Sequence, residues 1–177
     1  AAALGLSTRR QPFPVRTYGA VEAQLEILDP PLGRIPCEMF YLSQDTPPEG
    51  VTGDIHFAGS GGVESIGPEW RGKIVAVLGG LRGEAHDLAM RFAPLAIISI
   101  SDQLATPPIR VEQLPEVRAK VGAVPEVLIA HSDGLHLVRE GARRARIVAR
   151  SQEGEATSQN VVAELPGHEF FISREVE

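Results

Sequence analysis

The feature that most constrains the fold is a pair of continuous apolar runs with a helix-like segment between them. Residues 73–78 and 95–100 are almost wholly apolar, as expected of short strands that are covered on both faces. Residues 84–93 place apolar side chains at the i, i+3, i+4 and i+7 spacing of one helix face, and Pro94 ends the pattern. This strand–helix–strand order predicts a right-handed crossover between parallel strands.

Other short strands are expected on either side of this unit. Alternating apolar and polar residues predict half-buried strands, and further apolar runs predict buried ones. The segments concerned are 24–28, 39–42, 53–58, 126–130, 145–150 and 160–165, with a polar link at 151–158. We therefore expect an α/β fold, built as a β-sandwich or open barrel with two main helices flanking it.

The second helix is expected at residues 132–140. Ser132 is expected to be its N-cap, and Asp133 lies in the first turn, where a negative charge is favourable. Leu135 and Val138 are expected to face the core of the domain.

The charge distribution argues against a nucleic-acid partner. The 177 residues carry a net charge of -6, and the arginines between residues 143 and 150 are interleaved with apolar residues. No apolar run approaches the roughly 20 residues that span a bilayer, so no membrane segment is expected in this chain. Cys37 is the single cysteine, so no disulfide forms within the chain, and cysteine usage leaves the cellular compartment open.

A glycine-rich loop after the first apolar run keeps a nucleotide-binding interpretation open. Gly79, Gly80 and Gly83 precede the expected helix, and Asp102 follows the second run, at the place of a ribose-binding acid. The spacing departs from G-x-G-x-x-G, and Glu84 puts a negative charge where phosphate would bind. A glycine-rich turn without a ligand is the favoured interpretation, and a nucleotide-binding α/β domain is an alternative.

The histidines do not form a recognisable metal or catalytic motif. His131 and His136 are five residues apart, whereas the i, i+4 spacing places two histidines on one helix face. His86 is expected to lie off the apolar face of its helix, and His56 is expected to be exposed. Ser132 beside His131 resembles a catalytic triad in composition only. We therefore assign no catalytic, cofactor-binding or metal-ligating residue in this chain.

Five segments along the chain are informative when they are taken in order. They are Gln11–Val15, Trp70–Val77, Val124–Ala130, Ser132–Leu135 and Thr157–Gly167. In this order they resemble the motifs of the protease-associated domain in two-zinc aminopeptidases of the transferrin-receptor and glutamate-carboxypeptidase-like group. The second segment resembles the family's Gly-Lys-Ile-Val strand, and the last resembles the junction at which the domain re-enters the peptidase.

The resemblance implies a non-catalytic domain of a zinc-dependent aminopeptidase. In that family the domain forms a cap beside the active-site cleft, limits substrate access and offers a surface for partners. The family's zinc ligands begin with a His-x-Asp motif beyond the re-entering strand, whereas His168 is followed by Glu169 and Phe170. Zinc is thus expected in the parent enzyme and not in this chain. The expected partners are the peptidase domain of the same parent chain and a peptide or protein substrate.

The resemblance also implies domain bounds. Residues 1–20 are expected to be an arm from the preceding part of the parent, 21–158 the protease-associated domain, and 159–177 the start of the peptidase domain. An extracytoplasmic parent is compatible with this interpretation. A free-standing interaction domain, as in receptor-like relatives that lost their zinc, is a second alternative.

The excursion at residues 101–124 is the candidate for a surface that faces substrate or a partner. It follows a buried strand, and its three prolines lower the entropy that the segment loses on binding. Ile109, Val111 and Leu114 supply apolar surface there, either for that role or to cover the sheet.

Overall fold

The computed structural model describes residues 7–40, 43–103 and 124–164, and the chain divides into two units. The compact unit comprises residues 18–152. The other unit, which we name the arm, comprises residues 1–17 and 153–177, of which 7–17 and 153–164 are described.

Strands and helices alternate in the central part of the compact unit. The strands are β1 (Ser7–Asp29), β2 (Gly33–Ile35), β3 (Glu38–Met39), β4 (Val51–Phe57), β5 (Ile74–Leu78), β6 (Ala96–Ile100), β7 (Glu126–Ile129) and β8 (Arg144–Glu164). The helices are α1 (Glu84–Arg91) and α3 (His131–Arg139), with two short 3-10 helices, η2 (Val63–Ser65) and η3 (Pro68–Trp70). None of these described helices is long and apolar enough to cross a membrane.

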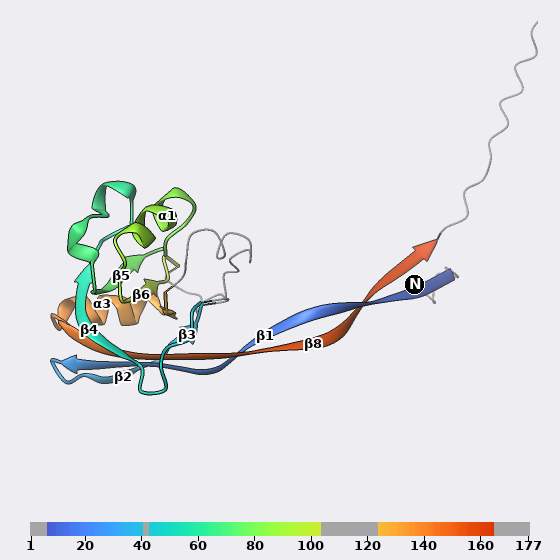
Figure 1. Cartoon of the computed structure of the whole chain (residues 1–177), viewed down its shortest axis with the longest axis horizontal. Coiled ribbons are helices and arrows are strands. Elements are labelled where there is room, and N and C mark those ends of the chain that lie inside the picture. The colour runs from blue at the N-terminus through green and yellow to red at the C-terminus, as the bar shows by residue number, and fades with distance from the viewer. Residues whose placement is uncertain (1–6, 41–42, 104–123, 165–177) are drawn as a thin grey trace, which may run out of the picture. The chain divides into compact units, whose positions relative to one another are not determined.

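The eight strands of the described residues form one sheet in the order β2-β1-β8-β4-β5-β6-β7-β3 (Figure 1). Strands β4 to β7 pair in parallel, with Ile74 opposite Ala96 between β5 and β6, and Ile98 opposite Val127 between β6 and β7. Helix α1 connects β5 to β6, so the predicted crossover between parallel strands is confirmed. The expected α/β fold with two main helices is confirmed as well.

The sheet curls because one strand changes partners along its length. Val51, in the first half of β4, pairs with Ile147 of the antiparallel β8, whereas Ile55, in the second half, pairs with Ile74 of the parallel β5. Strands β2 and β3 lie at opposite ends of the strand order, yet only residues 36–37 separate them in the chain. Three residue steps span at most about 11 Å, so the two edges of the sheet approach each other as in an open barrel.

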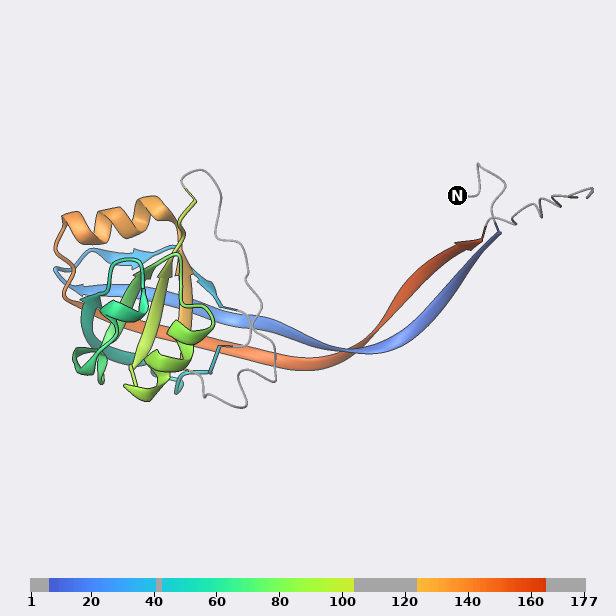
Figure 2. The ribbon, with the colours of Figure 1, turned by 90° about the horizontal axis from the view of Figure 1, so that it is seen from above.

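Two apolar clusters lie on opposite faces of the parallel strands. Residues of β5 and β6 alternate between them: Ile74 and Ile98 belong to one cluster, and Val75 and Ile97 to the other. Both faces are therefore buried, which explains the continuous apolar runs in the sequence. Figure 2 shows α1 and α3 on opposite sides of these strands.

The N-cap of the second helix lies two residues earlier than predicted. The helix begins at His131 after Ala130, and no described side chain caps it, so the expected capping role of Ser132 is wrong. The start of the helix is held by another contact, because Nδ1 of His131 lies 2.9 Å from the carbonyl oxygen of Ser101, just after β6.

The same helix also turns a different face to the sheet. Leu135 and Val138, which were expected to face the core, are 43% and 54% exposed, whereas Gly134 and Leu137 are buried. A Cβ atom on Gly134 would overlap the side chain of Ile100, so glycine lets the helix approach β6 closely. The contact with the sheet therefore runs along the glycine side of α3.

Three further expectations are wrong. Residues 151–158, expected to be a polar link, continue strand β8. His86, expected off the apolar face of α1, is only 4% exposed. Helix α1 packs against η2 as well as the sheet, so its buried stripe is broader than the apolar spacing predicts. The third is His56, which was expected to be exposed. It is half-buried, and its ring centroid lies 6.4 Å from that of Trp70.

The arm consists of two neighbouring strand segments, residues 7–17 of β1 and 153–164 of β8. Figures 1 and 2 show them side by side and running in opposite directions. A Cβ atom on Gly154 would lie 3.0 Å from Oγ1 of Thr17, which shows how closely the two segments approach.

Candidate functional site

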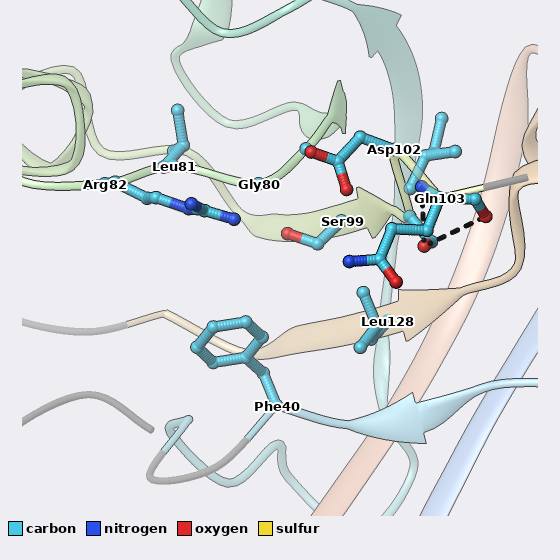
Figure 3. A pocket seen from close by; sticks show the side chains of 11 residues that line it. Phe40, Gly80, Leu81, Arg82, Ser99, Asp102, Gln103 and Leu128 are labelled. Carbon is cyan, nitrogen blue, oxygen red and sulfur yellow. Dashed lines mark hydrogen bonds between the residues drawn. The ribbon is translucent and has the colours of Figure 1, made fainter. Parts of the chain in front are cut away.

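A pocket of about 240 Å³ lies where the parallel strands β5 and β6 end (Figure 3). We name it the β5–β6 pocket. It is formed by the loop after β5, the residues after β6, and side chains from β7 and from the residue after β3. The side chains that line it include Phe40, Leu81, Arg82, Ser99, Asp102 and Leu128. The carboxyl ends of parallel strands are the usual place for ligands in α/β proteins.

Two glycines bring the loop after β5 close to the strand ends. Gly79 and Gly80 have φ angles of 80° and 71°, in the left-handed region that favours glycine. A Cβ atom on Gly80 would lie 3.2 Å from Oγ of Ser99, and one on Gly79 would lie 3.6 Å from the Asp102 carboxylate. The structure therefore brings together the glycine loop and the aspartate that the sequence suggested as partners.

The geometry of this pocket disfavours a nucleotide. Its volume is below the roughly 300–1,000 Å³ of typical small-molecule sites. Asp102 lines the pocket, and Glu84 lies in the first turn of α1, so negative charge occupies the region where helix amides would bind phosphate.

A buried carboxyl group lies behind the pocket wall. Ser99 of β6 donates a hydrogen bond of 2.5 Å to Oε1 of Glu126 on β7, and the two residues are 1% and 5% exposed. Burial raises the pKa of Glu126 to about 7, and the hydrogen bond from Ser99 opposes that shift. Neither residue was recognised from the sequence as part of a site. Ser99 interrupts an apolar run and Glu126 begins one, and a polar residue at such a position is a signal.

The remaining titratable side chains do not assemble a reactive centre in the described residues. No three His, Cys, Asp or Glu side chains among them are placed to hold a metal ion. Burial raises the pKa of the Cys37 thiol to about 11, which makes it a poor nucleophile. Nδ1 of His86 is buried with no hydrogen-bond partner among the described residues, 3.7 Å from Oδ1 of Asp87. His136 is exposed, with Nδ1 4.0 Å from the Glu140 carboxylate.

A second hollow, of about 200 Å³, is almost wholly apolar. It lies beside α3 and is lined by residues that include Leu78, Ile100, Leu135 and Val138. The two helix residues that were expected in the core thus form part of an exposed apolar surface instead.

The predicted substrate-facing residues Ile109, Val111 and Leu114 lie outside the described residues. Their role stays a prediction.

The comparisons with known proteins concern the fold. No protein-family profile and no curated protein sequence matches the chain. Three solved structures share its fold over most of its length. They are a zinc aminopeptidase from Bacillus subtilis (TM-score 0.67, 20% identity, 94% of this chain and 39% of that chain), an aminopeptidase from Aneurinibacillus sp. strain AM-1 (0.62, 20%, 92% and 39%) and a peptidase M28 precursor from Shewanella amazonensis SB2B (0.70, 19%, 94% and 43%).

At these identities the likeness establishes a shared fold. The present chain spans about two fifths of the length of each of those proteins. Its α/β fold therefore also occurs as one part of larger aminopeptidase chains. In the zinc aminopeptidase, that part makes up about two fifths of the chain.

Proposed function

We propose that this chain is the non-catalytic, protease-associated domain of a zinc-dependent aminopeptidase, where it forms a cap that limits access to the active-site cleft. The observation that carries the proposal is the shared fold, which extends over 94% of this chain and 39% of a zinc aminopeptidase. The five sequence segments that resemble the protease-associated domain, in the family's order, support it independently.

The path of the chain also supports an inserted domain. A domain inserted into another one is joined to it by two neighbouring connections. Strands β1 and β8 are neighbours in the sheet, and β1 leads into the compact unit while β8 leads out of it. We propose residues 1–20 as the connection from the preceding part of the parent, 21–158 as the domain, and 159–177 as the start of the peptidase domain.

The proposed role does not include catalysis by this chain. The described residues hold no cluster that fits a zinc ion, so we propose that zinc is bound by the peptidase domain of the same parent chain. The partners of the domain are then that peptidase domain and the peptide substrate. Ile109, Val111 and Leu114 are proposed to lie on a loop that faces the substrate or a protein partner.

Zinc content and peptidase activity test this proposal directly. The isolated 177-residue chain is expected to bind no stoichiometric zinc and to leave aminoacyl chromogenic substrates intact. The full product of the gene is expected to contain zinc and to hydrolyse them. Zinc-dependent turnover by the isolated chain would refute the non-catalytic role. A full-length product without zinc or activity would instead support the free-standing interaction domain of a receptor-like relative.

The access role is tested with substrates of different length. In the full-length protein, replacing Ile109, Val111 and Leu114 with serine is expected to lower kcat/KM for an extended peptide more than for a single-residue chromogenic substrate. A long peptide uses remote contacts to fix its scissile bond, and the short substrate lacks them. Leu135→Ser on α3, which is already exposed, serves as the matched control. Equal losses on both substrates would contradict the proposed access role.

A further inference from the structure

The β5–β6 pocket presents two opposite charges to one small cavity. Arg82 reaches it from the loop after β5, and Asp102 reaches it from the end of β6. Figure 3 shows the guanidinium group of Arg82 extending along Gly80 toward Ser99, and the carboxylate of Asp102 on the other side of the same space. Neither side chain forms an ion pair within the described part of the chain. Both charges are therefore available to a ligand.

The hydroxyl group of Ser99 lines the pocket but is closed to a ligand. Its proton is donated to Oε1 of Glu126 at 2.5 Å, and the residue is only 1% exposed. The groups that a ligand can pair with are therefore the two charged ones. Asp102 offers acceptors for a cationic donor group, and Arg82 offers donors for a carboxylate.

The rest of the wall is apolar. Phe40, which is only 6% exposed, and Leu128, which is 7% exposed, form the side of the pocket opposite the charged residues, as Figure 3 shows. An aliphatic side chain of a ligand would be removed from water there. The volume of about 240 Å³ suits a ligand of roughly ten non-hydrogen atoms rather than a nucleotide.

We propose that the β5–β6 pocket binds a free α-amino acid with an aliphatic side chain. The ammonium group of the ligand points toward Asp102, its carboxylate pairs with Arg82, and its side chain packs on Phe40 and Leu128. The proposal rests on the pocket alone and goes beyond the proposed cap function. The zinc and activity measurements described above do not bear on it, so the two proposals succeed or fail separately.

A titration with four related small molecules tests the recognition of each charge. The ¹⁵N-labelled 177-residue chain is titrated near neutral pH with L-leucine, L-leucinamide, 4-methylpentanoate and 3-methylbutylamine, which share one aliphatic group. L-leucine is expected to shift the amide signals of Gly79, Gly80 and Asp102 with a Kd on the order of 1 mM. The three analogues each lack one charge, and each is expected to bind about tenfold more weakly or worse.

Variants identify which residue recognises which end of the ligand. Arg82→Gln is expected to weaken leucine binding by about tenfold and to abolish its advantage over leucinamide. Asp102→Asn is expected to abolish the advantage of leucine over 4-methylpentanoate. Both residues are exposed, so the fold is expected to persist. Arg139→Gln on α3 and Glu69→Gln on η3, exposed charges outside the pocket, are the matched controls and are expected to leave binding unchanged.

Several results would overturn the proposal. One is the absence of saturable shifts with leucine at about 20 mM, well above the expected Kd. Another is equal binding of leucine and leucinamide, which would indicate a peptide N-terminus as the ligand and no role for Arg82. A third is unchanged leucine affinity in both pocket variants.

Discussion

Two stretches of one strand, β1, bury their side chains to very different degrees. In the compact unit, Leu25 and Ile27 of β1 are 0% and 1% exposed. In the arm, Phe13 of the same strand is 38% exposed, and Val161 on the neighbouring β8 is 65% exposed. Both stretches satisfy the backbone pairing of a sheet, but only the first has layers of apolar side chains above it.

This difference shows that strand pairing and a buried core are separate properties. A two-stranded ribbon without a covering layer is marginally stable in water. The free energy of folding of this chain is therefore expected to come from the compact unit.

The largest expected effect contrasts one substitution in each region. Ile98 is fully buried in β6, so Ile98→Ala is expected to lower the free energy of unfolding by about 2–5 kcal/mol. Phe13→Ala in the arm is expected to change it by less than about 0.5 kcal/mol. Urea unfolding, followed by the fluorescence of the single and fully buried Trp70, measures both. Similar losses for the two variants would mean that the arm is packed in solution.

The next effect concerns pH and the buried carboxyl group of Glu126. Its folded-state pKa of about 7 is above the ordinary glutamate value of 4.5, so between these pH values the folded state holds a proton that the unfolded state has lost. Stability is therefore expected to fall as pH rises from about 5 to about 7.5, by at most about 3 kcal/mol. Glu126→Gln cannot titrate and is expected to remove this slope. Urea unfolding midpoints of wild type and Glu126→Gln, measured across that pH range, test this. An equal dependence of stability on pH in the two proteins would rule out Glu126 as its source.

A smaller effect is expected for the helix α1. The i, i+7 pattern predicts Phe92 as a core residue, and in the structure it packs against the second cluster while staying half-buried. Phe92→Ala is therefore expected to cost roughly 1–3 kcal/mol, less than the 3–5 kcal/mol of a fully buried phenylalanine. Chemical denaturation measures the cost. A midpoint equal to that of wild type would show that α1 does not depend on this contact.

The smallest effect is expected when the arm itself is removed. A chain that comprises only residues 18–152 is expected to keep its free energy of unfolding to within about 1 kcal/mol, because almost all described side chains of the arm are exposed. In the whole chain, hydrogen exchange of amides 7–17 and 153–164 is expected to be far faster than that of 74–78. Arm amides that are as protected as those of β5, in a strict monomer, would contradict this comparison.

Part of the candidate site was predictable from the sequence. The glycine loop and Asp102 follow two buried parallel strands, and the ends of such strands meet at one edge of a sheet. Phe40 and Leu128 were not predictable as pocket residues, because they reach it through the pairing of β3 with β7, which are far apart in the chain. In the sequence, Ser99 and Glu126 stand out only as a polar residue within an apolar run and one at the start of a run. Their hydrogen bond depends on the pairing of β6 with β7.

The orientation of α3 shows the same limit on another element. The apolar residues Leu135 and Val138 suggest a core face, yet the helix turns Gly134 and Leu137 to the sheet. Helical spacing defines which residues share a face. The face that is buried is decided by shape, here by the space that Gly134 leaves for Ile100.

By itself, the sequence determined the α/β class and the parallel crossover through β5, α1 and β6. These depend on local properties, namely the period of apolar residues, the positions of glycine and proline, and the kinds of polar side chain present. Only the tertiary structure decided which strands meet across the curled sheet, which side of α3 is buried, and which charges face one pocket. Those features depend on contacts between residues distant in the chain, and their packing is settled by the whole fold together.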